Sequence, residues 1–82
     1  MPDIKADEAV VKRISKDISM FHESVKTVET KRPFGKKAQD VVELSKMYAS
    51  DAQSYLDRGD LYTSFSCISY AHGLLDAVIK ML

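Results

Sequence analysis

The sequence predicts an all-α protein, an antiparallel up-down-up bundle of three helices that forms one domain over residues 1–82. Apolar residues recur at steps of three, four or seven along the chain, which is the period of a helix and not of a strand. Pro33 with Gly35, and later Gly59, interrupt this period at two places. Both interruptions are short, and short connections join neighbouring antiparallel helices.

The first predicted helix covers about residues 4–29 and carries a single apolar seam. The seam consists of Ile4, Val11, Ile14, Ile18, Phe21, Val25 and Val28. Pro33 disfavours helical geometry in the residue before it, so the helix ends ahead of this position. At 1.5 Å per residue, such a helix is roughly 35 to 40 Å long.

The second predicted helix covers about residues 36–57 and leads into the tripeptide Arg58-Gly59-Asp60, which extracellular adhesion proteins present to integrins. The apolar face consists of Ala38, Val41, Val42, Ser45, Tyr48, Ala49, Ala52, Tyr55 and Leu56. Gly59 is suited to the left-handed residue after a helix, and the Asp60 carboxylate is suited to cap the next one. We therefore interpret the tripeptide as a tight turn between helices and not as a displayed ligand.

The third predicted helix covers about residues 61–81 and is the most apolar of the three. Its apolar face is centred on Leu61, Phe65, Ile68, His72, Leu75 and Ile79, and is broadened by Cys67, Ala71, Leu74, Val78 and Met81. A helix this apolar must be covered on more than one side, so we expect it to pack on both other helices. The remaining arc holds small residues that would let another backbone approach.

Composition narrows the possible settings and chemistries. Cys67 is the only cysteine, which excludes an intramolecular disulfide and a zinc site built from several cysteines, and a cytoplasmic location is expected. The first residues lack the apolar core of a signal peptide, and no apolar stretch is long enough to span a membrane. Twelve basic and twelve acidic residues cancel, which argues against a protein whose main partner is a polyanion. No cofactor is expected.

The first functional hypothesis is a non-enzymatic module for protein-protein interaction or assembly, acting by self-association as a dimer or by binding another protein. Tyrosine is favoured in binding surfaces, and a small bundle without disulfides gains stability by association. The candidate interface consists of Tyr55, Tyr62, Ser66, Tyr70, Gly73 and Ala77.

The alternative hypothesis is an accessory protein that binds nucleic acid or phosphate through the first connection. Lys31, Arg32, Lys36 and Lys37 surround this connection, beside the free amides that begin the second helix. Phe34 could offer a stacking surface. Charges on a loop are more often simply solvated, so this hypothesis ranks second.

A third and weaker hypothesis concerns His72 and Asp76, which are four residues apart and share a helix face. Such a pair could belong to an enzyme or a metal site, but a metal needs at least a third ligand. A core histidine hydrogen-bonded to Asp76 or to a tyrosine is the simpler interpretation, and a buried, unreactive thiol is the simpler one for Cys67. No catalytic or metal-binding residues are therefore assigned.

The segment "AQSYLDRGDLYTSFSCISYAHGLLDAVIKML" resembles the C-terminal half of a family of small archaeal proteins known as domain of unknown function 357. The resemblance rests on Tyr55, Leu56, Gly59, Asp60, Ser69, Tyr70, Ala71, Gly73, Leu74, Leu75, Asp76 and Ala77. It implies a compact helical bundle and an archaeal, cytoplasmic origin. It implies no activity and no catalytic residues.

Overall fold

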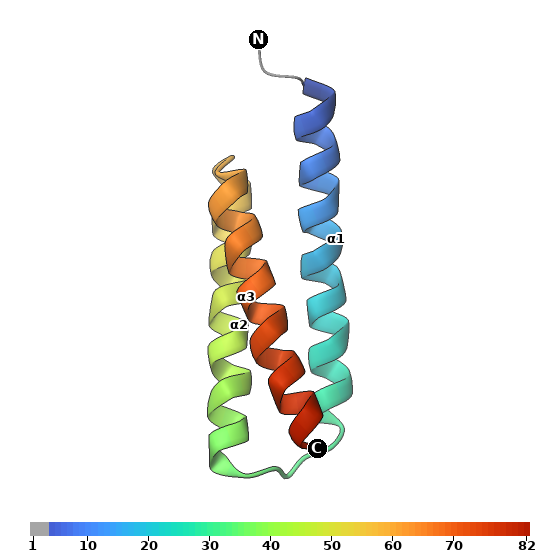
Figure 1. Ribbon diagram of the computed structural model, residues 1–82, viewed down its shortest axis with the longest axis vertical. Coiled ribbons are helices and arrows are strands. Elements are labelled where there is room, and N and C mark those ends of the chain that lie inside the picture. The colour runs from blue at the N-terminus through green and yellow to red at the C-terminus, as the bar shows by residue number, and fades with distance from the viewer. Residues whose placement is uncertain (1–3) are drawn as a thin grey trace.

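The chain folds into three helices that run in alternating directions. The computed structural model describes the backbone of residues 4–82 and the side chains of residues 7–82, so the side chain of the predicted seam residue Ile4 lies outside the described part. The helices are α1 (Ile4–Glu29), α2 (Lys36–Asp57) and α3 (Leu61–Met81). They form a rod of 50 × 16 × 16 Å in which α1 extends beyond the α2–α3 turn (Figure 1). The predicted bundle is confirmed.

The core lies along the axis of the rod and takes residues from all three helices at steps of three and four. Its members are Ile14, Ile18, Phe21, Val25, Val28, Val42, Ala49, Ala52, Ile68, Ala71, Leu75 and Val78. Two serines are also buried, and each hydroxyl donates a hydrogen bond of 2.6 Å, from Ser45 to the Val42 carbonyl and from Ser64 to the Ala52 carbonyl. Because both hydroxyls have partners, they avoid the penalty of an unpaired buried polar group.

The buried face of α3 differs from the predicted one. It is centred on Ser64, Ile68, Ala71, Leu75 and Val78, and a helix seam of this kind advances by three and four residues in turn. Phe65 and Ile79, which were predicted near the centre, are 45% and 44% exposed. The prediction weighted side chains by hydropathy and so passed over Ser64, whose hydroxyl reaches a backbone acceptor on α2.

The α2–α3 turn has the geometry predicted for Gly59 and Asp60. Gly59 has φ +80°, its amide donates to the Leu56 carbonyl at 3.0 Å, and the Asp60 amide donates to the Tyr55 carbonyl at 2.9 Å. This pair of bonds closes the end of α2. The Asp60 carboxylate then accepts a hydrogen bond of 3.1 Å from the Thr63 amide and caps α3. The tripeptide is therefore a structural turn.

At the C-terminal end of α1, an ion pair links α1 to α2. The Lys46 ammonium lies 2.7 Å from a Glu29 carboxylate oxygen and 3.4 Å from one of Glu43. The hydrogen bond from Lys46 lowers the pKa of Glu29, and the same bond raises the pKa of Lys46.

Among the described helices, none combines the length and the apolar character needed to cross a membrane.

Two glycines should respond to alanine in opposite directions. Gly59→Ala places a side chain at positive φ and should lower the free energy of unfolding by about 1 kcal/mol or more. Gly73→Ala lies within α3, where an added Cβ meets no atom within 4 Å, and should raise it by about 0.5–1 kcal/mol. Urea unfolding at low protein concentration measures both changes. If both substitutions changed the free energy of unfolding in the same direction, this interpretation of the backbone would be wrong.

The cap of α3 should make the protein sensitive to acid. Hydrogen bonds from Thr63 hold the pKa of Asp60 below its usual value, so the stabilisation is present above the unfolded-state pKa of about 4 and is lost as the pH falls through the folded-state pKa. Asp60→Asn keeps a capping acceptor and does not titrate. The thermal midpoint of this variant should therefore fall less than that of the wild type between pH 6 and the acid limit, which calorimetry at several pH values would measure. If the thermal midpoints of the wild type and of Asp60→Asn fell equally with pH, the role of the Asp60 carboxylate as a titrating cap would be refuted.

Candidate functional site

The side of α3 that faces away from α1 and α2 carries most of the predicted interface. We call it the outer face of α3, and it consists of Tyr62, Ser66, Ser69, Tyr70, Gly73 and Ala77. Every member is exposed, and the exposed fractions of Tyr62 and Tyr70 reach 85% and 52%. No charged residue occurs between Leu61 and Leu75. Over about four helical turns, this exposed surface therefore has only uncharged side chains.

Tyrosine rings frame one edge of this face without forming a single cluster. The rings of Tyr48 on α2 and Tyr70 on α3 meet edge to face, with centroids 4.6 Å apart. Tyr55 lies on α2 and is half-buried, and the Arg58 guanidinium lies 4.5 Å from its ring centroid. Tyr55 therefore packs against its own chain, and it does not belong to the outer face of α3.

The four predicted anion-binding cations do not converge. Arg32 lies 3.9 Å from the Glu29 carboxylate and Lys36 lies 3.2 Å from that of Asp40, so two of the four charges are already partly balanced. Gly35 begins α2 without a side-chain cap, as the sequence indicates. A shallow hollow of about 520 Å³ beside this start is lined by Arg32, Pro33, Phe34, Lys36 and Gln39.

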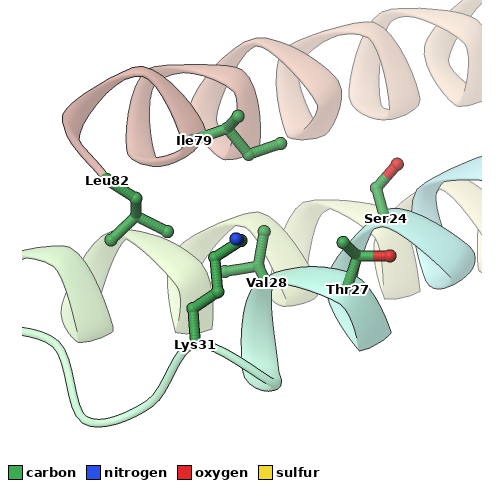
Figure 2. A pocket seen from close by; sticks show the side chains of 6 residues that line it. All are labelled: Ser24, Thr27, Val28, Lys31, Ile79 and Leu82. Atoms are coloured by element: carbon green, nitrogen blue, oxygen red, sulfur yellow. The ribbon is translucent and has the colours of Figure 1, made fainter.

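Lys31 faces a different hollow, between the C-terminal ends of α1 and α3. This hollow has a volume of about 360 Å³ and is lined by Ser24, Thr27, Val28, Lys31, Ile79 and Leu82. Figure 2 shows the Lys31 side chain reaching along the hollow beside Val28, with Ile79 entering from α3. The basic connection is thus divided between two surfaces, which weakens it as one binding site for a polyanion.

His72 is held by α1 and not by Asp76 or a tyrosine, which corrects the prediction. Its Nε2 lies 2.8 Å from the carbonyl oxygen of Asp17, and its ring meets that of Phe21 edge to face at 5.7 Å. A carbonyl can only accept, so Nε2 carries the proton. Asp76 is exposed. In the described part of the chain, no three His, Cys, Asp or Glu side chains are placed to hold a metal ion.

The only cysteine is half-buried on α3, packed against the core, rather than fully buried as predicted. Burial raises the pKa of the Cys67 thiol, and the negative charges of Asp51 and Asp60 raise it further. A raised pKa keeps the sulfur protonated, and the thiol is a much weaker nucleophile than the thiolate. The environment of Cys67 therefore opposes nucleophilic chemistry.

The alignment of α1 against α3 could not be predicted from the sequence. His72 on α3 contacts Asp17 on α1, and Ile79 on α3 lines a hollow together with Ser24 on α1. Two residues that are seven apart on α3 therefore face two residues that are seven apart on α1. The seven-residue spacing was visible in the sequence. The alignment of α1 against α3 was not, because the two helices are parallel and no short turn joins them.

Comparison with known proteins identifies one family. The sequence profile of the family described as "Protein of unknown function (DUF357)" matches residues 16–82. This match includes much of α1 and all of α2 and α3, and so extends beyond residues 52–82, on which the resemblance rests. A search of curated proteins finds no match.

The position of His72 predicts unequal effects of two substitutions. His72→Ala removes a hydrogen bond and a ring contact with Phe21, and should lower the free energy of unfolding by about 1–2 kcal/mol. Asp76→Asn should leave it within about 0.5 kcal/mol, because Asp76 is exposed. Urea unfolding measures both changes, and nitrogen NMR of His72 should show a protonated Nε2. A larger loss from Asp76→Asn would restore the predicted pair.

Proposed function

We propose that this chain, which belongs to the DUF357 family of proteins of unknown function, is a protein-binding assembly module that acts through the outer face of α3. The proposal concerns association and assigns no reaction. It rests mainly on one observation, the exposure of an uncharged helix surface with a glycine at its middle.

Gly73 supports the proposal because the fold of a single chain gives no reason for it. Its backbone has ordinary helical geometry, since Gly59 is the only glycine with positive φ among the described residues. An added Cβ would meet no atom of the same chain within 4 Å. Glycine at such a position disfavours the helix by about 1 kcal/mol relative to alanine. A partner that packs against the α3 backbone would explain a residue without a side chain there.

The chemical character of the surface supports the same proposal. Binding surfaces are depleted in charge at their centre and enriched in tyrosine, and the outer face of α3 has both properties. Ser66, Ser69 and Ala77 are small, so they keep the helix backbone accessible beside the larger rings of Tyr62 and Tyr70. By contrast, the exposed sides of α1 and α2 carry ion pairs such as Arg13 with Asp17 and Lys36 with Asp40.

Gly73→Arg should strongly weaken association without harming the fold. Arginine has a higher helix propensity than glycine, and the position is exposed, so the thermal midpoint measured at low protein concentration, where association does not contribute, should not fall. A bulky charge in the middle of the surface should weaken binding at least tenfold, which corresponds to about 1.4 kcal/mol. Affinity isolation of the tagged protein from its own cells, with a light-scattering mass of the eluate, measures what remains bound.

The matched control is Ser19→Arg, which adds the same side chain to an exposed position of α1. A stoichiometric protein, either a second copy or another chain, should be recovered with the wild type and with Ser19→Arg but not with Gly73→Arg. Equal recovery with both variants would overturn the proposal. Recovery that disappears after nuclease treatment would favour the basic connection and nucleic acid instead.

A further inference from the structure

We infer that the partner on the outer face of α3 is a second copy of this chain, with the two α3 helices antiparallel and a two-fold axis beside Ser69 and Tyr70. This inference rests on the proposed function and names the partner at that surface. It comes from the order of side chains along α3 and from the separation of charge between the two ends of the bundle.

An antiparallel pair places residues at mirrored heights along the two helices. Ser66 and Gly73 are equally far from the midpoint between Ser69 and Tyr70, so the axis at this point puts Ser66 of one copy opposite Gly73 of the other. Both are small, which brings the backbones together where the helices cross. The uncharged residues 64–75 of one α3 helix then meet the same uncharged residues of its partner, in keeping with the isologous contact of a two-fold dimer.

The same register brings larger and charged residues together on either side. Tyr62 lies at the height of the partner's Ala77, and Asp76, one residue away, offers the tyrosine hydroxyl an acceptor. Lys80 lies at the height of the partner's Gly59, so its long side chain brings a positive charge close to the acidic α2–α3 turn of the partner. A two-fold dimer contains each of these contacts twice.

Charge separation along the rod favours the antiparallel arrangement over the parallel one. The α2–α3 turn carries Asp57 and Asp60 around a single Arg58, whereas Lys80 lies at the opposite end of α3 (Figure 1). The first connection lies at the Lys80 end as well, and two of its four cations are partly balanced by Glu29 and Asp40. A parallel dimer would bring Lys80 to Lys80 and Asp60 to Asp60, and like charges in register repel.

Disulfide cross-linking of the purified full chain tests this geometry in a Cys67→Ala background. Ser66→Cys and Gly73→Cys are made as separate proteins, mixed, and oxidised under mild conditions. We expect the mixture to give the Ser66–Gly73 cross-linked dimer, with little cross-linking of either protein alone, because copies of one position are separated by seven residues of helix, about 10 Å. Light scattering of the unmodified chain should give twice the mass of one chain.

A charge variant gives an independent readout. Lys80→Glu should weaken the dimer about three- to tenfold at low salt, because it places a negative charge beside the partner's acidic α2–α3 turn, and Asp60→Asn in the same chain should recover part of that loss while keeping the cap. Cross-linking of each protein with itself would mean a parallel dimer and would overturn the inference while leaving the proposed function intact. A purified chain that is monomeric, but that captures another protein through Gly73, would do the same. A chain that binds no protein at all would overturn both.

Discussion

The spacing of core residues at alternating steps of three and four is the constraint on which the rest of this structure depends. Such a seam is narrow, and it keeps one side of each helix directed at the axis of the rod along its length. On α3 the seam runs from Ser64 to Val78 and is shared by both neighbouring helices. Because α1 and α2 meet α3 on the same side, the opposite side is left free. The exposed surface of α3 is therefore a direct result of how the core is built.

The close approach of α2 and α3 depends on small side chains. α2 contributes Ser45, Ala49 and Ala52 to the core, and the Ser64 hydroxyl spans the remaining gap to the Ala52 carbonyl. The larger buried side chains come from α1, chiefly Phe21 and Ile14, and from α3, chiefly Ile68 and Leu75. α1 extends beyond the α2–α3 turn (Figure 1). The turn is closed by its own hydrogen bonds and by the cap at Asp60.

Local features of this protein could be predicted from the sequence, and features that depend on alignment between distant helices could not. The helix bounds and the turn at Gly59 follow from periodicity and from the conformational freedom of glycine, both of which are properties of a few adjacent residues. The partner of His72 is 55 residues away, on a parallel helix, so local spacing points only to Asp76. The burial of Ser64 and the exposure of Phe65 have a similar cause, since hydropathy does not reveal which carbonyl a hydroxyl will reach. The exposure of the outer face could be anticipated, because the helical period places its small residues opposite the apolar arc.

Gly73 connects the stability of the fold to its proposed role. A domain of this size has a small margin of stability, and neither a disulfide nor a covering β-sheet adds to it in the part of the chain that the structure describes. A sequence shaped only by the stability of one chain would place alanine at an exposed mid-helix position, because the change fills open space and favours the helix. Association can offset the cost of glycine, since a partner packed on the α3 backbone gains contact area that a side chain would block. The same contact would cover Tyr62 and Tyr70, whose exposure is otherwise unfavourable. The residue that is hardest to explain in the isolated chain is thus the one that a docked helix explains most directly.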